Sequence, residues 1–163
     1  GRWEQALALL RGIWEAELEP GVVSFNAGVS ACAAGGQWQR ALSLLGQLGE
    51  VVLEPDLVSY NAGLSACARG GVWEQALLLL DDLREAVAEP DIISYNAGIS
   101  ACATGGQWAQ ALSLLSKVRE VRLEQDVVGY SAGVSACQGD AEWERALLLL
   151  GEMRGAKLAP YVI

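Results

Sequence analysis

Apolar residues between positions 56 and 71 recur with the spacing of a helix. Four of them fall on one helical face, at steps of three, four and three residues: Leu57, Tyr60, Leu64 and Cys67. This spacing is typical of an α-helix and differs from the alternation of a strand. Asp56 stands where a helix N-cap is expected, and the Gly70-Gly71 pair favours a tight turn at the other end. We therefore predict a helix over about residues 57–70.

A second apolar stripe follows directly and predicts a second helix over residues 72–86. Its members are Trp73, Ala76, Leu77, Leu80 and Leu83, with charged residues between them. The helix is expected to end before Pro90, because proline cannot continue a helix, and Asp91 can cap the next one. The two helices and their short turn form a helical hairpin.

Close copies of this hairpin flank it on both sides at a period of 35 residues. The period is visible in Trp3, Trp38, Trp73, Trp108 and Trp143, in Cys32, Cys67, Cys102 and Cys137, and in Pro20, Pro55, Pro90 and Pro160, with Gln125 at the missing proline position. Such a period is typical of stacked helical repeats, in which no single unit buries its apolar face alone. Taken alone, 57–70 contains enough poor helix formers to be a short strand, and its repetition decides for a helix.

The repeats divide the whole chain, 1–163, into a single array. We expect repeats at 22–56, 57–91, 92–126 and 127–161, preceded by a partial repeat at 1–21 that matches only a second helix. Residues 162–163 would begin a further repeat, so we expect a segment of a longer array. The predicted fold class is all-α, a solenoid of stacked hairpins with no single central core.

One glycine lies inside the first helix of every repeat: Gly28, Gly63, Gly98 and Gly133. Glycine in a helix interior costs about 1 kcal/mol relative to alanine, so something must offset that cost. We expect the gain to be close approach of a neighbouring helix. A phosphate-binding loop is not indicated, because the later Gly-Gly turns lack the lysine and the spacing of a P-loop.

Composition narrows the possible chemistry. The chain has 163 residues, a net charge of −9 and no histidine, and its mean hydropathy is +0.26. Charges interrupt every leucine cluster, so no membrane span and no membrane partner are expected, and no targeting segment is recognised. Equivalent cysteines on neighbouring repeats should lie about 10 Å apart, too far for a disulfide. We expect buried thiols, no metal site and no cofactor.

Charge is distributed unevenly between the two helices of the repeat. Residues 22–35 and 92–105 carry no charge, whereas 57–70 and 127–140 carry only Arg69 and Asp140. The acidic residues lie on the second helices and in the loops between repeats. In a curved solenoid the two helices of each hairpin line opposite faces, so we expect an acidic convex face and a neutral, polar concave groove.

An amide or hydroxyl recurs in the first helices, at Asn26, Asn61, Asn96 and Ser131. These residues are offset from the apolar stripe and are expected to face the groove. An amide presents both donors and an acceptor, which suits hydrogen bonding to the edge of a base. The alternative is a side chain that bonds to the local backbone near the helix start. The residues alone leave both possibilities open.

The repeat as a whole resembles the pentatricopeptide repeat family, of the type with 35-residue units. The resemblance is carried by the strict period, by a proline and aspartate at the junctions, by Phe25-Asn26, Tyr60-Asn61 and Tyr95-Asn96 in the first helices, and by Ala-Leu pairs such as Ala76-Leu77 in the second. It covers the entire chain. It implies a right-handed α-solenoid that binds single-stranded RNA, one base per repeat, in a chloroplast or mitochondrion.

The resemblance also implies which residues read the bases. The pairs would be Asn26 with Asp56, Asn61 with Asp91, and Asn96 with Asp126, a combination that favours uracil in the family. The fourth pair, Ser131 with Tyr161, departs from the family pattern. Val23, Val58, Ile93 and Val128 match the position that sandwiches a base from its face, with a role in the core as the alternative.

Two functions from different classes follow from the sequence. The first is binding of uridine-rich single-stranded RNA, in organellar RNA processing or expression. The second is a protein-interaction scaffold that uses the acidic convex face for other proteins and does not bind RNA. The net charge favours the second, and the neutral groove with its amide and carboxylate pairs favours the first. The lysine that family members often carry for phosphate contact is matched only by Arg69, and no catalytic residue is predicted.

Overall fold

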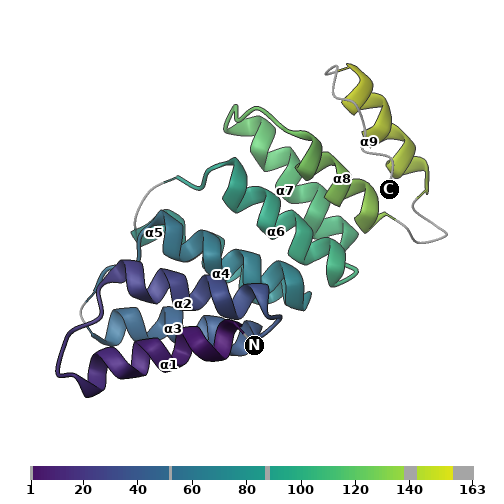
Figure 1. Ribbon diagram of the computed structural model, residues 1–163. Coiled ribbons are helices and arrows are strands. Elements are labelled where there is room, and N and C mark those ends of the chain that lie inside the picture. Colours follow the sequence, from purple (N-terminus) through teal and green to yellow (C-terminus); the bar gives the residue numbers. More distant parts are fainter. Residues whose placement is uncertain (1, 52, 87–88, 138–142, 156–163) are drawn as a thin grey trace.

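The described part of the chain consists of α-helices joined by short turns, with no strand among them (Figure 1). The computed structural model describes residues 2–51, 53–86, 89–137 and 143–155. Within these residues the helices are α1 (Arg2–Glu15), α2 (Val22–Ala34), α3 (Trp38–Glu50), α4 (Leu57–Gly70), α5 (Trp73–Ala86), α6 (Ile92–Thr104), α7 (Trp108–Glu120), α8 (Val127–Ala136) and α9 (Trp143–Gly155). The predicted all-α stack of hairpins is confirmed.

Local signals set the ends of the helices. The backbone N–H of Ser59 donates to Asp56 Oδ1 at 2.8 Å, and the Ser59 hydroxyl accepts from the Asp56 N–H at 3.1 Å, which makes a reciprocal cap at the start of α4. At the other end Gly71 adopts a left-handed conformation with φ of 64°. The predicted cap and turn are therefore confirmed, and the alternative of a strand over 57–70 is wrong.

The helices form two layers that run along the stack in chain order (Figure 1). Helices α2, α4, α6 and α8, here the inner layer, each pack against the next inner helix and against the flanking helices of the other layer. Helices α1, α3, α5, α7 and α9, here the outer layer, pack only on inner helices in the described residues. Because only the inner helices approach one another, the inner layer is the concave side.

The glycines inside the inner helices are contact points for leucines of both neighbouring outer helices. A β-carbon added to Gly98 would lie 2.7 Å from Leu80 Cδ1 of α5 and 3.2 Å from Leu114 Cδ1 of α7. Gly28, Gly63 and Gly133 each have an equivalent pair of leucine neighbours, one from each flanking outer helix. The predicted close approach is confirmed, and it explains why alanine does not replace these glycines.

Tryptophans at the start of the outer helices link successive repeats. A β-carbon added to Gly35 or Gly70, in the turn of the following repeat, would lie 2.4 or 2.5 Å from Cδ1 of Trp3 or Trp38. The guanidinium of Arg40 in α3 also stacks 4.3 Å from the centre of the Trp3 ring in α1. Side chains therefore connect outer helices whose backbones do not pack together.

The apolar core is spread along the stack. One cluster of buried residues extends from α1 to α4 and another from α4 to α9. All four cysteines are buried and unbridged, as predicted. Burial raises the pKa of both Cys67 and Cys102 to about 11, so their thiols stay protonated and serve as small apolar groups.

The glycine contacts predict opposite effects for two glycine substitutions. Gly98→Val should lower the free energy of unfolding by about 1 to 3 kcal/mol, because the added carbons displace Leu80 and Leu114. Gly46→Ala, at an exposed position of α3 with no atom within 4 Å of the added carbon, should raise it by up to about 1 kcal/mol. Urea unfolding followed by circular dichroism measures both. Equal effects of the two substitutions would show that the leucine contacts are unimportant.

Candidate nucleic-acid interface

Polar side chains on the inner layer form three equivalent units at the junctions between repeats. Each unit joins an asparagine of one inner helix to the aspartate that caps the next inner helix, and to the residue three positions after that aspartate. Unit 1 is Asn26, Asp56 and Ser59; unit 2 is Asn61, Asp91 and Ser94; unit 3 is Asn96, Asp126 and Gly129. The structure thus brings together, within the described residues, the three asparagine and aspartate pairs that the family resemblance implies.

In unit 1 a single carboxylate oxygen bonds to both neighbours. Asn26 Nδ2 donates to Asp56 Oδ1 at 3.1 Å, and the backbone N–H of Ser59 donates to the same oxygen at 2.8 Å. The Ser59 hydroxyl lies 2.6 Å from Asn26 Oδ1 and 2.8 Å from Asp56 Oδ1, so it can donate to either. Ser59 is fully buried and Asn26 is 8% exposed. The asparagine is therefore held at both ends of its amide.

Unit 2 repeats this arrangement with a longer amide bond. Asn61 Nδ2 lies 3.4 Å from Asp91 Oδ1, and the Ser94 hydroxyl lies 2.6 Å from Asn61 Oδ1. The backbone N–H of Ser94 caps onto Asp91 Oδ1 at 2.8 Å. Ser94 is fully buried, like Ser59. The serine contact is thus the same in both units, whereas the contact to the carboxylate varies.

Unit 3 lacks the serine. Asn96 Nδ2 lies 2.9 and 3.0 Å from the two oxygens of Asp126, and the backbone N–H of Gly129 caps onto Asp126 at 3.0 Å. Asn96 is 7% exposed, and its Oδ1 is buried and has no hydrogen-bond partner among the described residues. Asp126 therefore satisfies the nitrogen of the Asn96 amide, and the oxygen still needs a hydrogen-bond donor.

The contacts in unit 1 favour the charged form of its aspartate. Burial alone would raise the pKa of Asp56, but the hydrogen bonds from Ser59 and Asn26 outweigh it and hold the pKa below its usual value. The carboxylate is therefore ionised at neutral pH. It accepts from the asparagine amide and fixes which end of that amide faces the junction.

Four apolar side chains lie exposed beside these units. Val23, Val58, Ile93 and Val128 are 82%, 60%, 59% and 53% exposed. The alternative of a role in the core is therefore wrong for all four. An exposed valine or isoleucine at a fixed period offers a row of flat apolar contacts on the inner layer.

A hollow of about 370 Å³ on the inner layer brings the polar and apolar residues together. Asn61 of α4, Asn96 of α6 and Asp126 before α8 contribute its polar groups. Ile93 and Val128 contribute apolar walls. Members of two successive units therefore line one open space that a planar ring could enter.

Part of the predicted site lies outside the described residues. Ser131 is in α8 and is half-buried, but Tyr161, its predicted partner, is not described. The same holds for Asp140 and for residues 162–163. The Ser131 pair stays a prediction.

Two site residues were missed in the sequence, Ser59 and Ser94. Each lies three residues after a junction aspartate, the spacing of a capping serine, which was a recognisable signal. Their contact with the asparagine of the preceding repeat, 33 residues earlier, had no local signature.

The inner helices themselves are nearly free of charge, as predicted, and the carboxylates of the three units belong to the junction aspartates that precede them. Arg69 is the single charged side chain in α2, α4, α6 and α8. The outer helices carry exposed acids, among them Glu74, Asp81, Asp82 and Glu85 on α5. The negative charge of the described helices is therefore concentrated on the outer layer.

Family models of the pentatricopeptide repeat domain match residues 8–70 and 78–140, and a model of the single repeat matches residues 58–86. These matches cover most of the chain. The chain belongs to the pentatricopeptide repeat family. A search of curated proteins gives no significant match.

Solved structures of pentatricopeptide repeat proteins share the fold. The protein PPR10 in complex with an 18-nt psaJ RNA element is 30% identical, with a TM-score of 0.82 over 98% of this chain. PPR10 from maize is 25% identical, with a TM-score of 0.76 over 99% of this chain. The PPR domain of Arabidopsis thaliana protein-only RNase P 1, in complex with tRNA, is 12% identical and has a TM-score of 0.79 over 96% of this chain and 83% of its own.

The chain spans about a quarter of the length of PPR10, 24% for the RNA complex and 23% for the maize structure. Among the described residues, no three His, Cys, Asp or Glu side chains gather as a metal site would require. None of the described helices has the length and apolar composition of a bilayer-crossing helix.

The capping contacts predict a pH-dependent effect of Asp56→Ala. At pH 7 the substitution should lower the free energy of unfolding by about 1 kcal/mol, the usual cost of losing an N-cap. Because the pKa of Asp56 is lowered by folding, this contribution is complete above the usual pKa of 3.8 and is lost as the pH falls through the folded-state pKa. Urea unfolding at pH 7 and in acid measures the difference.

Gly21 provides a reciprocal control for the same effect. It precedes α2 with extended backbone and no side-chain cap. Gly21→Asp should therefore raise the free energy of unfolding by a few tenths of a kcal/mol, the difference between glycine and aspartate caps. A cost of Asp56→Ala that stays the same in acid would contradict the role given to the carboxylate.

Proposed function

We propose that this chain binds single-stranded RNA along its inner layer, one base per unit. The observation that carries the proposal is the row of junction units, each with an amide and a carboxylate beside an exposed valine or isoleucine. Family membership and the RNA complex of PPR10 support it. The aromatic residues of the described inner helices are buried, so the exposed valines and isoleucine would cover the faces of the bases while the amides contact their edges.

The chemistry of the units favours uracil. An asparagine amide has two N–H groups, and the aspartate occupies one of them. The other can donate to a base that presents a carbonyl oxygen at its edge, as uracil does. Cytosine presents an amino group at the same place, and two donors would then face each other. We propose a preference for three successive uridines at units 1 to 3.

The proposed role is binding, and no residue of this chain is proposed to be catalytic. By family resemblance the RNA would be an organellar transcript, in a chloroplast or mitochondrion, and binding would serve its processing or expression. Localisation of the full-length protein by fluorescence microscopy tests the compartment.

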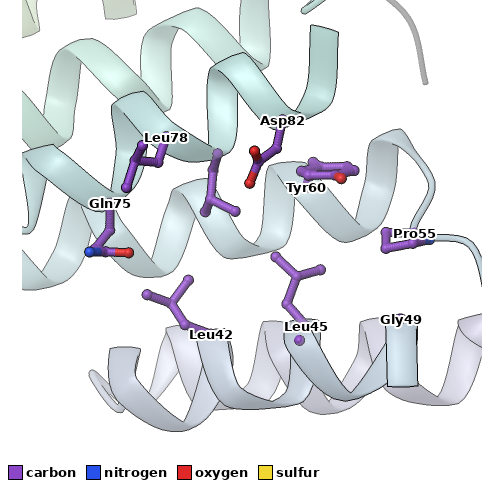
Figure 2. A pocket seen from close by; sticks show the side chains of 10 residues that line it. Leu42, Leu45, Gly49, Pro55, Tyr60, Gln75, Leu78 and Asp82 are labelled. Carbon is purple, nitrogen blue, oxygen red and sulfur yellow. The ribbon is translucent and has the colours of Figure 1, made fainter. Parts of the chain in front are cut away.

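A second candidate function is the binding of another protein at the outer layer. A hollow of about 370 Å³ lies between α3 and α5, where the backbones of the outer helices do not meet (Figure 2). Leu42 and Leu45 project into it from α3, and Leu78 and Asp82 line it from α5 (Figure 2). An apolar hollow beside a carboxylate suits a basic amphipathic segment. Capture of such a segment with no RNA binding at low salt would put this candidate first.

Base selectivity tests the main proposal. The chain should bind short oligo-U more tightly than oligo-A or oligo-C in fluorescence-anisotropy titrations. Asn61→Ser and Asn96→Ser should shift the preference toward guanine-containing RNA, because the amide donor is lost and the shorter side chain leaves room for a purine. Gln75→Ser, which removes an exposed amide from the outer helix α5, should change nothing. Failure to bind any RNA at low salt would refute the proposal.

The scarcity of cations on the inner helices predicts a weak salt dependence. With Arg69 as its cation, the slope of log affinity against log salt should be about −0.7, the value for one phosphate contact on a single strand. Arg69→Gln should bring the slope close to zero for every RNA sequence, and Arg154→Gln on the outer helix α9 should leave it unchanged. A slope as steep as that of a protein with many phosphate contacts would contradict this arrangement.

A further inference from the structure

The three units differ at one position, the residue three places after the capping aspartate. Units 1 and 2 have serine there, and unit 3 has Gly129. Asn26 and Asn61 accept from their serine hydroxyls at 2.6 Å, whereas the buried carbonyl oxygen of Asn96 has no partner in the part of the chain that the structure describes. The asparagine and aspartate are the same in all three units, so this difference is invisible in the pairs themselves.

The missing hydroxyl coincides with a different position of the asparagine. Asn96 Nδ2 is within hydrogen-bond distance of both oxygens of Asp126, whereas Asn26 and Asn61 contact one oxygen of their aspartates, at 3.1 and 3.4 Å. A β-carbon added to Gly129 would lie 2.5 Å from Asn96 Oδ1. The Asn96 amide therefore occupies space that a serine side chain would fill.

The two contacts of the amide do different things. The carboxylate fixes which end of the amide faces it, because an amide oxygen against a carboxylate would be repelled. The serine hydroxyl fixes where the amide lies, since it holds the oxygen end from the next inner helix. Without the serine hydroxyl, Asn96 keeps the orientation of its amide, but nothing holds its oxygen end in place.

We propose that Ser59 and Ser94 are positioning residues for base selection, and that Gly129 makes unit 3 the least selective of the three. The proposal rests on the function proposed above. A base at unit 3 would meet an amide drawn toward Asp126 and α8, so the distinction between a carbonyl and an amino group at the base edge is weaker there. Units 1 and 2 would distinguish uracil from cytosine strongly, and unit 3 would prefer uracil more weakly.

The test measures selectivity at each unit separately. The probe is an RNA with three adjacent uridines flanked by adenosines, which fix its register, together with three versions that carry one cytidine in place of a uridine. The ratio of the dissociation constants for cytidine and uridine gives the selectivity at each position. In the unaltered chain one terminal position of the three should be less selective than the other two by about two- to tenfold, the range for one hydrogen bond.

Gly129→Ser should raise selectivity at that weak position to the level of the other two. Gly129→Ala is the matched control, because it adds the β-carbon without the hydroxyl and should not restore selectivity. Ser94→Ala should lower selectivity at the neighbouring position alone, and Ser94→Thr, which keeps the hydroxyl, should retain it. Circular dichroism of each variant confirms that it is folded.

The outcomes separate this inference from the function on which it rests. Absence of RNA binding by the unaltered chain overturns both. Binding with a uridine preference that is equal at all three positions, and unchanged by Gly129→Ser, overturns the role of the serines and leaves the proposed function in place. A loss of affinity in Ser94→Ala that is the same for every RNA would show a purely structural role for that serine.

Discussion

The junction aspartate is the contact on which both the stack and its inner surface depend. In unit 1 the Asp56 carboxylate caps α4 and receives the amide of Asn26 from α2, so one charged group ends a loop, starts a helix and joins two repeats. The same arrangement recurs 35 residues later at Asp91 and again at Asp126. The carboxylate has little conformational freedom because it is bound to the backbone of its own helix. The asparagine that donates to it is therefore also restricted. A binding surface made in this way needs no loop of its own.

Close packing of the inner layer makes these junction contacts possible. The glycine inside each inner helix lets leucines from two outer helices reach the helix backbone, as Leu80 and Leu114 do at Gly98. The inner helices also pack on one another, and a side chain of one reaches the first turn of the next. Helix propensity is lowered at each glycine, and packing compensates. The inner helices therefore take part in both the apolar interior and the polar inner surface.

Much of this could be predicted because the strict period shows that the local signals of one hairpin apply to every repeat. The helices, their caps, the buried cysteines and the glycine contacts follow from one repeat read in its place in the series, whereas the asparagine and aspartate pairs came from the family resemblance. The sequence did not reveal the contacts between residues 33 positions apart. It also left open whether the valines at the start of the inner helices are buried or exposed. Ser94 reads as a helix cap, and only the structure shows that its hydroxyl also reaches Asn61. Gln125 reads as a lost proline, yet its side chain donates to the backbone carbonyl of Leu115 at 2.7 Å and ties the loop to α7.

The separation of the outer helices has a mechanical consequence. In the described residues the inner helices pack on one another, and an aspartate bridges each pair of successive inner helices. Along the outer layer single side chains such as Arg40 over Trp3 connect successive helices. The contacts thus hold the spacing of the inner helices more firmly than the spacing of the outer helices. We therefore expect a change in curvature to alter the spacing of the outer helices more than the spacing of the junction units. An extended ligand on the inner layer would therefore meet junction units at a nearly constant distance from one another, even if the curvature of the array changes.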